Sequence, residues 1–556
     1  MIMIFLNFIM ATPSQFIDEW IKNEDWWFVN SQYIDAYITL HYQHLLDIDI
    51  SNELPITQII IYDQLPRHVF RNQDCNHIIL YFLQKALAVN IEEKYRNNLS
   101  INLWCFSLLP KRHTNNLINI LEVMKISWDK LNCSSNEQDK LIIKKFIKAT
   151  YQRCPTNDQS KLIQFYPNNE NFYPTKYMTV KDIKIDFADI LDNSVYDNIL
   201  IDESKFFNIK NYINNNENNI ILSLSGGVDS MICSAILSIK YNYIVHINYC
   251  NRTTSDREEE FVKAWCDYMR FPLYIRRIEE INRPLCMENN LRDIYESYTR
   301  DVRYSTYKTV NSFDIQNKNR PISLNPIKSE IIKTIPRVIL GHNKDDCLEN
   351  IFTNIAHENH YENLNGMIEI STQDGIEFIR PLLNISKDEI RNFAYKMNYP
   401  FLPNSTPSWS QRGQIRTNIV PVLEKWDPRI TESLFSLSDT IKDLHIILNH
   451  FVDYYLQKTI TTFQNGIYEY HFPLENDNLG IIDIPKINLF WKVYLTKLCT
   501  TPISQSSYTT PSIKSLNNLT LKLKNWDNIA IMKIALKKNM EIIFTKTKCE
   551  IIYKSS

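Results

Sequence analysis

An apolar run that stops abruptly at two adjacent glycines constrains this chain more than any other feature. Residues 220–230 read IILSLSGGVDS, and an apolar-periodic segment follows from Met231 to Ile239. This order predicts a buried strand, a tight loop and a helix. The chain has only eight glycines in 556 residues, and none precedes Gly226. Gly226 and Gly227 therefore predict a place where the backbone takes a positive φ or approaches a ligand closely.

The start of the predicted helix suits an anion such as phosphate, because it offers unpaired backbone N–H groups and the positive end of the helix dipole. Ser225 and Ser230 can add hydroxyl donors, and Asp229 can hold a metal ion near the phosphates. An ordinary strand-to-helix turn is the alternative. The loop resembles the pyrophosphate-binding loop of the PP-loop ATP pyrophosphatases, which cleave ATP to AMP and pyrophosphate. That resemblance assigns ATP binding to Ser225, Gly226, Gly227, Val228, Asp229 and Ser230.

Strands and helices alternate after the loop. IVHINY at 244–249 and LYIRRI at 273–278 are short strand-like runs, separated by a segment with an acidic helix start. The alternation predicts a parallel α/β sheet with its ligand at the carboxyl ends of the strands. His246 and Asn248 would lie at that edge, although a histidine in a strand is more often a core residue. Their HxN spacing resembles the HVNH motif of the lysidine synthase family, with Tyr249 replacing the second histidine.

Residues 289–308 predict an amphipathic helix with Glu296, Arg300 and Arg303 on one face. These side chains could be a solvated ion-pair face. Alternatively, a carboxylate and two guanidinium groups face the site and meet an amino-acid substrate, phosphate or RNA. The ExxxRxxRY spacing resembles the lysidine synthases and favours the second interpretation. Residues 312–334 are expected to form an inserted loop.

A second glycine-marked motif, RVILGHNKDDCLEN, occupies residues 337–350. A strand is expected to end at Gly341, and a helix to begin four residues later. Carboxylates at a helix start can simply be caps. However, Asp346 and Glu349 share a helix face, and Mg²⁺ at ATP sites takes one or two carboxylates plus phosphate oxygens. The motif resembles the GHxxDDxxE element of tRNA-modifying PP-loop enzymes, which implies catalytic roles for both and places Gly341 and His342 at the nucleotide.

Three arginines downstream are candidate contacts for RNA or substrate. Arg380 ends a predicted strand at the same carboxyl edge, and Arg412 and Arg416 are spaced to make a phosphate clamp. They could also be ordinary helix-surface charges. The RNxIR…PxL pattern of the lysidine synthases matches here, with Gly413 where asparagine is usual. The resemblance to that family runs from about 218 to 430 through four ordered motifs.

The segment 11–170 predicts a separate helical domain. Within it, residues 54–71 resemble the DQxPRNxFR motif of a bacterial family of helical, TPR-like proteins of unassigned function, with histidine in place of asparagine. Asp63 could form a site with Arg67 or Arg71, but a structural ion pair at a helix end is the commoner arrangement. No activity is assigned to this region.

The remaining segments complete the domain plan. Residues 171–218 are rich in Asn, Asp and Tyr and predict a connector, 219–430 a catalytic domain, and 431–556 a helical and then β-rich tRNA-binding region. Residues 511–556 carry nine lysines against three acidic residues and alternate like a hairpin with Asn539 near the turn. This end of the chain is either a solvated sheet face or a platform for an RNA backbone.

Composition excludes several classes of protein. A net charge of −2 gives no global attraction to nucleic acid, so RNA binding needs a local basic face. Eleven cysteines without a CxxC pair argue against a disulfide framework or a clustered metal site and indicate a reducing, cytoplasmic setting. The apolar first ten residues are too short to span a bilayer and lack the flanks of a signal peptide, so no membrane role is expected.

These features predict a multidomain protein: an all-α N-terminal domain, a Rossmann-like parallel α/β domain and a small α+β C-terminal region. The resemblance implies an ATP-dependent ligase of the tRNA(Ile)-lysidine synthase family, in which ATP adenylates the wobble cytidine of a tRNA(Ile) with a CAU anticodon and free L-lysine attacks it. ATP and Mg²⁺ would be the cofactors, with Asp229 and Asp346 as metal ligands. The alternatives are a thiolation-type PP-loop tRNA modifier and a non-catalytic RNA-binding protein that kept the fold.

Overall fold

The computed structural model describes residues 11–554 with gaps, and it divides them into two compact units. The first unit comprises Met1–Lys344 and Glu369–Ser405, and the second comprises Asp345–Ile368 and Thr406–Ser556. The gaps are residues 28–29, 72–74, 158, 167–203, 207–219, 237–241, 270, 319–334, 357–365, 398, 403–410, 465–466, 474, 477–479, 482–485, 500–510, 527–529 and 546–547. The predicted connector therefore lies outside the described residues, apart from Ser204–Phe206, and so does the apolar segment at residues 1–10.

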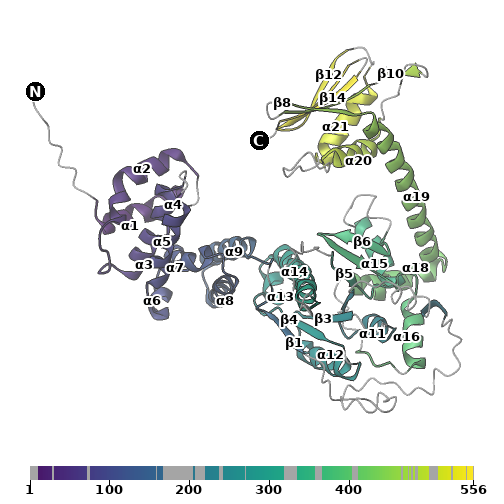
Figure 1. Ribbon diagram of the computed structural model, residues 1–556, viewed down its shortest axis with the longest axis horizontal. Coiled ribbons are helices and arrows are strands. Elements are labelled where there is room, and N and C mark those ends of the chain that lie inside the picture. The colour runs from purple at the N-terminus through teal and green to yellow at the C-terminus, as the bar shows by residue number, and fades with distance from the viewer. Residues whose placement is uncertain are drawn as a thin grey trace, which may run out of the picture. The chain divides into compact units, whose positions relative to one another are not determined.

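The first unit begins with short helices packed around an aromatic core, as predicted (Figure 1). Thr12 starts the first helix with a capping box, in which its side chain accepts from Gln15 N. Phe16, Trp20 and Trp104 are at most 1% exposed and fill the centre. The elements are α1 (Pro13–Lys22), η1 (Glu24–Trp26), α2 (Gln32–Tyr42), η2 (Gln43–Leu46), α3 (Pro55–Asp63), α4 (Leu65–Val69), α5 (Asn76–Ala88), α6 (Glu93–Asn97), α7 (Ile101–His113), α8 (Leu117–Cys133) and α9 (Glu137–Gln152).

A seven-stranded sheet in the order β1-β4-β3-β2-β5-β7-β6 forms the centre of the same unit. The five inner strands are parallel, and the two edge strands, β1 and β6, are antiparallel. This confirms the predicted parallel α/β sheet. The strands are β1 (Ile163–Tyr166), β2 (Ile220–Ser223), β3 (Asn242–Asn248), β4 (Leu273–Arg277), β5 (Arg337–Ile339), β6 (Ile370–Gln373) and β7 (Ile376–Ile379).

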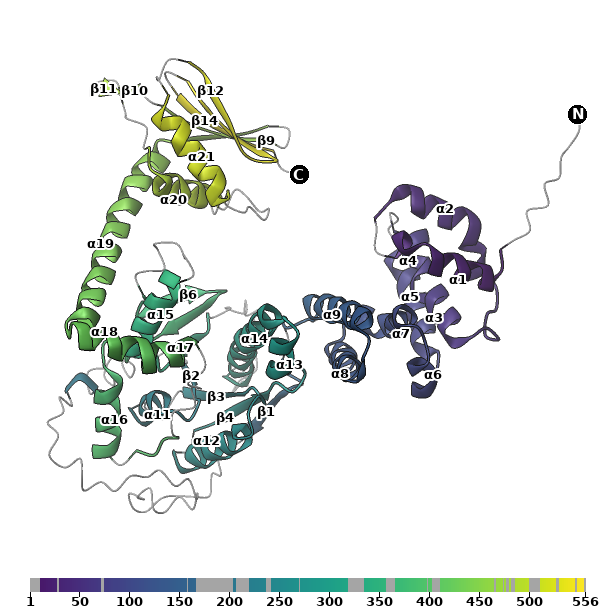
Figure 2. The ribbon, with the colours of Figure 1, turned by 180° about the vertical axis from the view of Figure 1, so that it is seen from behind.

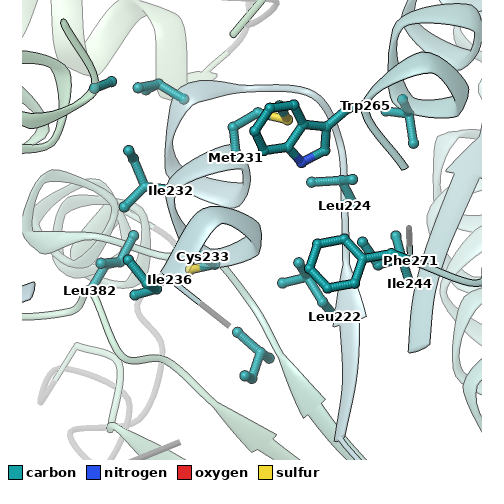
Figure 3. Packing of buried hydrophobic residues seen from close by; sticks show 14 of the residues in the cluster. Leu222, Leu224, Met231, Ile232, Cys233, Ile236, Ile244, Trp265, Phe271 and Leu382 are labelled. Atoms are coloured by element: carbon teal, nitrogen blue, oxygen red, sulfur yellow. The ribbon is translucent and has the colours of Figure 1, made fainter. Parts of the chain in front are cut away.

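Helices cover both faces of the sheet, so the inner strands are buried on both sides. On one face, Met231, Ile232 and Ile236 of α11 belong to one buried apolar cluster with Leu222 and Leu224 of the strand and loop (Figure 3). The same cluster includes side chains of α12 and α16, whereas α13 and α14 cover the other face. These helices are α11 (Val228–Ile236), α12 (Ser255–Met269), α13 (Arg283–Glu288), α14 (Arg292–Lys318) and α16 (Lys387–Lys396).

The last N-terminal helices belong to the same core as the sheet. Tyr151 of α9 lies 4.9 Å from the ring of Tyr298 on α14, and its hydroxyl donates to Glu280 O at 2.8 Å. Trp128 of α8 in turn donates its indole N–H to the Tyr151 hydroxyl at 2.6 Å. Buried apolar residues continue from α8 and α9 into the sheet without a break. The helical region is therefore fixed to the α/β region by shared apolar packing between α8, α9 and the sheet.

The second unit combines helices with a five-stranded antiparallel sheet in the order β12-β13-β14-β9-β8 (Figure 2). The predicted hairpin is confirmed, because β12 and β13 pair and Asn539 lies in their turn. The elements are α15 (Lys344–Ala356), α17 (Gln411–Gln414), the π-helical turn η6 (Ile415–Ile419), α18 (Val420–Trp426), α19 (Ile430–Gln457), β8 (Ile460–Gln464), β9 (Ile467–Pro473), β10 (Glu475–Asn476), β11 (Gly480–Ile481), α20 (Asn488–Cys499), α21 (Ile513–Lys524), β12 (Met532–Lys537), β13 (Met540–Phe544) and β14 (Lys548–Lys554).

Two local predictions differ from the structure. Residues 163–166 were expected to be helical but form strand β1 on the edge of the central sheet, pairing with β4. The inserted loop expected at 312–334 begins later, because α14 continues to Lys318. Among the described residues, no helix is both long and apolar enough to cross a membrane.

Candidate active site

The glycine loop joins β2 to α11 at the point where the sheet order changes direction. The chain runs outward from β2 through β3 and β4 on one side and returns to β5 and β7 on the other. Such a point leaves a crevice at the carboxyl ends of the strands. Gly226 has a φ of +85°, and a Cβ there would lie 2.8 Å from Leu402 Cδ1. Leu402 N donates to Gly226 O at 2.9 Å, which holds the loop in place.

The two serines of the loop hydrogen-bond within it. Ser230 Oγ accepts from Ser225 N at 3.2 Å, donates to Gly227 O at 3.0 Å and lies 3.0 Å from Ser225 Oγ. These bonds fix the backbone of the turn. The predicted contacts of the hydroxyl groups with phosphate stay predictions.

Gly227 and Gly341 differ in the space around them. A Cβ on Gly227 would meet only Ser225 Oγ, at 3.6 Å, among the described residues, so the main chain there is open. A Cβ on Gly341 would lie 2.8 Å from Ser230 N and 2.9 Å from the carbonyl carbon of Asp229. The end of β5 therefore packs directly against the backbone of the loop, and only glycine fits there.

Asp229, the first acidic residue of α11, already has a partner for each carboxylate oxygen. Asn343 Nδ2 donates to Oδ1 at 2.9 Å, and Lys387 Nζ lies 2.8 Å from Oδ2. The described residues also contain no group of three side chains able to hold a metal ion. As arranged, both carboxylate oxygens of Asp229 are occupied by these partners. Its predicted role as a Mg²⁺ ligand stays a prediction, as does that of Asp346.

Lys387→Met should destabilise the first unit by about 1–2 kcal/mol, because the carboxylate of Asp229 would lose its cation while only partly exposed. Both side chains are 15% exposed in the present pair. Urea unfolding of the full chain measures the effect. Lys396→Met, at the exposed end of the same helix, is the control and should change the free energy of unfolding by less than about 0.5 kcal/mol. Equal effects of the two variants would contradict the assigned pair.

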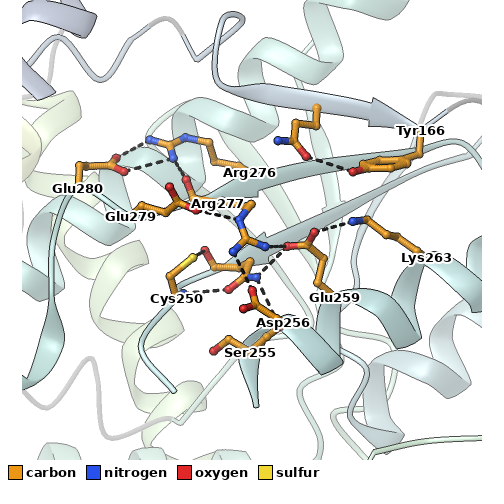
Figure 4. A network of polar contacts seen from close by, with 12 residues as sticks. Tyr166, Cys250, Ser255, Asp256, Glu259, Lys263, Arg276, Arg277, Glu279 and Glu280 are labelled. Carbon is orange, nitrogen blue, oxygen red and sulfur yellow. Dashed lines mark hydrogen bonds and ion pairs between the residues drawn. The ribbon is translucent and has the colours of Figure 1, made fainter. Parts of the chain in front are cut away.

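His246 and Asn248 point into the protein. His246 is 3% exposed, and its Nδ1–H donates to Leu224 O at 2.8 Å, so it supports the strand that leads into the loop. Asn248 donates to Glu259 Oε2 at 2.7 Å, and the same carboxylate pairs with Arg277 Nη1 at 2.6 Å (Figure 4). His246 thus holds the backbone at Leu224, and Asn248 Oδ1 holds the backbone at Cys250 N. The predicted contact of both residues with the nucleotide stays a prediction.

The stability of the first unit should fall as the pH drops below about 6.5, because burial holds the pKa of His246 below its usual value. The unfolded chain then binds a proton that the folded chain excludes, so acid favours unfolding. This histidine contributes at most about 1.4 kcal/mol between pH 7.5 and 5.5. Melting temperatures at the two pH values should differ less for His246→Asn than for the wild type, and an unchanged difference would contradict this account.

On α14, the side chains of Glu296, Arg300 and Arg303 differ in their exposure and in their partners. Glu296 is 57% exposed and pairs with Arg292 at 2.7 Å, and Arg300, 49% exposed, lies 3.8 Å from Asp301. This supports the solvated ion-pair interpretation for both. Only Arg303 is half-buried, with its guanidinium 5.5 Å from the Tyr304 ring centre. The roles predicted for all three in substrate or RNA binding stay predictions.

Arg380 and His342 meet at the carboxyl edge of the sheet. Arg380 Nε donates to His342 Nδ1 at 3.3 Å, and Arg380 Nη1 donates to Ser371 Oγ at 2.9 Å. Burial lowers the pKa of Arg380. The structure thus brings together two of the residues predicted from separate motifs.

In the second unit, α15 and η6 bring Glu349 and Arg416 together. Glu349 is 3% exposed and its Oε1 lies 2.6 Å from Arg416 Nη2 and 2.8 Å from Nε. Its other oxygen, Oε2, and Arg416 Nη1 are buried without a hydrogen-bond partner. Burial raises the pKa of Glu349, and Arg416 opposes that rise while Asp346 adds to it. Arg416 Nη2 also lies 3.7 Å from Asp346 Oδ1, and Arg412, one helical turn away, adds positive charge near Glu349.

Residues 201–423 match the family model of the PP-loop domain. Together with the glycine loop at the switch point of a parallel sheet, this match makes the central part of the chain similar to a PP-loop domain.

Curated proteins that the chain resembles include tRNA(Ile)-lysidine synthases. That of Borrelia garinii subsp. bavariensis is 26% identical over 307 residues, which cover 54% of this chain and 60% of the relative. That of Staphylococcus aureus (strain MRSA252) is 23% identical over 252 residues, covering 44% and 53%. The chain thus spans 53% to 60% of the length of these relatives.

Among solved structures, the U34-tRNA thiolase NcsA from Methanococcus maripaludis with its [4Fe-4S] cluster matches 43% of this chain and 79% of that chain. Its sequence identity is 18% and the TM-score is 0.30.

Sequence patterns did not reveal Asn343 and Lys387 as partners of Asp229. Asn343 lies inside the GHNKDD motif, so its position beside the loop was the available signal. Lys387 is 158 residues from Asp229 and begins an ordinary amphipathic helix, so no local pattern points to it.

Proposed function

We propose that this protein is an ATP-dependent ligase of the tRNA(Ile)-lysidine synthase type. The observation that carries the proposal is the open main chain at Gly227, in a loop whose other side is packed against Gly341 and Leu402. Backbone N–H groups at a helix start are suited to a pyrophosphate group, and here Gly227 N donates a long bond of 3.4 Å to Ser225 Oγ. The match of residues 201–423 to the PP-loop domain and the similarity to tRNA(Ile)-lysidine synthases support the same chemistry.

The proposed reaction has two steps. The C2 oxygen of the wobble cytidine in a CAU anticodon attacks the α-phosphorus of ATP, the bond to the β-phosphate oxygen breaks, and pyrophosphate leaves. The side-chain amine of free L-lysine then attacks C2, the C2–O bond breaks, AMP leaves, and the proton released from the amine passes to solvent. The target base must be splayed out of the anticodon loop for both steps.

Charge stabilisation of the departing pyrophosphate comes from this chain's own groups. The amides of the glycine loop and the start of α11 present partial positive charge. Lys387, held by Asp229 at 2.8 Å, adds a cation beside the loop. Mg²⁺, when bound, would neutralise phosphate charge, and Asp346 is the residue proposed to hold it.

Glu349 is the stronger candidate to orient the lysine amine. Its Oε2 is buried without a hydrogen-bond partner, whereas Glu296 is 57% exposed and already pairs with Arg292. A buried acceptor without a donor is costly, so a ligand ammonium group would satisfy it. Arg416 beside it has an equally unpartnered Nη1, which suits a carboxylate of the same amino acid.

The C-terminal lysines divide into two groups. On the C-terminal sheet, Lys533 pairs with Glu541 at 2.9 Å and Lys548 pairs with Glu550, so these two lysines are neutralised. By contrast, the lysines of α21 are exposed and have no ion pair with the described residues. They are Lys514, Lys522 and Lys524. We assign the RNA-backbone contact to this helix.

Changing the three α21 lysines together to glutamate should weaken tRNA binding. The slope of log K against log salt, which is negative, should become shallower by about 2–3, because about 0.7–0.9 counterion is released per phosphate contact. Filter binding at several salt concentrations measures both. The double variant Lys533→Gln and Lys548→Gln is the control and should leave the slope within error. A slope that does not change in the triple variant would remove α21 from the RNA contact.

The function is tested with labelled lysine, ATP and tRNA(Ile) carrying a CAU anticodon. Lysine-dependent AMP release with label on the tRNA is the expected result. AMP release without label on tRNA would point to another nucleophile, as in a thiolation-type enzyme. Binding of tRNA with no ATP turnover would leave only an RNA-binding protein.

A further inference from the structure

The helix α19 carries more apolar surface than the core of the second unit covers. Its buried residues are Ser438, Val452 and Tyr455, and the Tyr455 ring lies 5.0 Å from the ring of Phe490 on α20. In Figures 1 and 2, α20 lies beside the C-terminal half of α19. One apolar face is enough for a helix to pack on one core. The apolar residues of α19 that point elsewhere therefore need a different explanation.

A second apolar stripe runs along an exposed face of this helix. Its large side chains are 43% to 63% exposed, and they are Leu437, Leu444, Ile447, Phe451 and Tyr454. The intervals between them are seven, three, four and three residues, which is the a and d spacing of a coiled-coil heptad. At 1.5 Å per residue the stripe is about 25 Å long. Scattered exposed apolar residues are ordinary, whereas a continuous stripe marks an interaction surface.

The residues beside the stripe favour a protein partner over RNA or a membrane. Asp443 borders the stripe and is exposed. Lys442 forms an ion pair with Asp439 at 2.8 Å, so this cation is neutralised. Helices that bind a membrane surface carry lysine and arginine on their polar face, and contact with an RNA backbone needs the same charges. The stripe therefore fits the apolar seam of another helix.

The stripe is complementary to itself when a second copy of α19 runs in the opposite direction. Two antiparallel heptad seams place each a residue opposite a d residue. A two-fold axis between residues 445 and 446 puts Leu444 opposite Ile447 of the second copy. The same axis puts Leu437 opposite Tyr454, so apolar side chains meet at the centre and at both ends. A two-fold interface requires this match, because both copies contribute the same patch.

Two polar residues at the edge of the stripe specify the direction of the partner. Asp443 and His450 are exposed, occupy the same heptad position seven residues apart, and form no ion pair with other described residues. In the antiparallel arrangement Asp443 faces His450 of the second copy, whose imidazole N–H donates to the carboxylate. In a parallel arrangement Asp443 would face Leu448, which leaves the carboxylate without a donor. Charge complementarity therefore favours the antiparallel copy.

We propose that α19 is a dimerisation helix, which pairs antiparallel with α19 of a second copy of this chain along the stripe from Leu437 to Tyr454. The apolar side chains form the centre of the interface, and an aspartate–histidine contact closes it on either side of the two-fold axis. The dimer goes beyond the proposed ligase function and does not depend on it.

Sedimentation equilibrium of the full chain over a concentration series measures the dimer dissociation constant. The wild type should reach the mass of two chains. Ile447→Asp should weaken the dimer at least about 100-fold, because the two-fold axis places the new charge in the apolar centre twice. Ile446→Asp is the matched control and should dimerise like the wild type. Ile446 is 54% exposed, against 63% for Ile447, but it occupies heptad position c, which points away from the seam.

A charge swap tests the direction of the partner. His450→Asp places like charges opposite Asp443 and should weaken the dimer about tenfold, whereas the double variant His450→Asp and Asp443→His should restore it. Melting curves of all variants should show one folded chain, because every changed side chain is exposed. A wild type that stays monomeric, or equal dissociation constants for Ile446→Asp and Ile447→Asp, would overturn the proposal. Failure of the double variant to restore the dimer would overturn the antiparallel pairing.

Discussion

Replacing Gly227 with alanine should lower kcat/KM for ATP about 100-fold, or about 2.7 kcal/mol, while the chain stays folded. The new methyl group would meet only Ser225 Oγ at 3.6 Å among the described residues, and the backbone there has no positive φ to strain. The methyl group would instead occupy the space in which phosphate oxygens approach the main chain. Steady-state kinetics and a melting curve of the same preparation measure the two effects.

Two other glycines serve as controls for this prediction. Gly375→Ala, in the turn between β6 and β7, has a φ of +73° and nothing within 4 Å of the added Cβ, so it should cost about 1 kcal/mol of stability without changing ATP kinetics. Gly341→Ala forces a Cβ to 2.8 Å from Ser230 N and should lower both stability and activity. Unchanged ATP kinetics in the Gly227 variant would contradict the proposed position of the pyrophosphate.

Glu349→Gln should lower lysine-dependent product formation about 100-fold while leaving tRNA-dependent release of pyrophosphate nearly unchanged. The carboxamide keeps an acceptor for Arg416, but it loses the charge that would hold an ammonium group. The free Oε2 makes this carboxylate the available partner. Pre-steady-state measurement of pyrophosphate and of labelled tRNA separates the two steps.

Glu296→Gln is the matched control, because that carboxylate is exposed and already paired with Arg292. Its product formation should stay within about threefold of the wild type, the scale of a surface ion pair. If the Glu296 variant loses lysine transfer and the Glu349 variant does not, the roles assigned to the two glutamates are reversed.

The central fold could be predicted because its signals are local. The apolar stretch at 220–224 ends at a glycine pair, and this alone predicts a strand, a loop and a helix in the order that the structure shows. The alternation of short β-branched runs with amphipathic helices likewise predicted the parallel sheet. The spacing of apolar residues and the residues at a turn indicate which side of a single helix or strand is buried. Here each element had one clear pattern.

Contacts between distant segments could not be predicted in the same way. Lys387 reaches Asp229 across 158 residues, and only the sheet topology brings them together. The four residues of β1 are too few to show a period, so their pairing with β4 gave no signal in the sequence. The spacing on α14 suggested one functional face, but spacing alone does not say whether that face meets solvent, as it does at Glu296 and Arg300.

The most direct test of the central claim is isotope exchange between labelled pyrophosphate and ATP. If the loop holds ATP while the cytidine oxygen attacks it, exchange should require tRNA, proceed without lysine and be lost in Gly227→Ala. Exchange that requires lysine but not tRNA would mean that lysine, and not the cytidine, is activated. Such a result, or no exchange with tRNA and ATP together, would contradict the account.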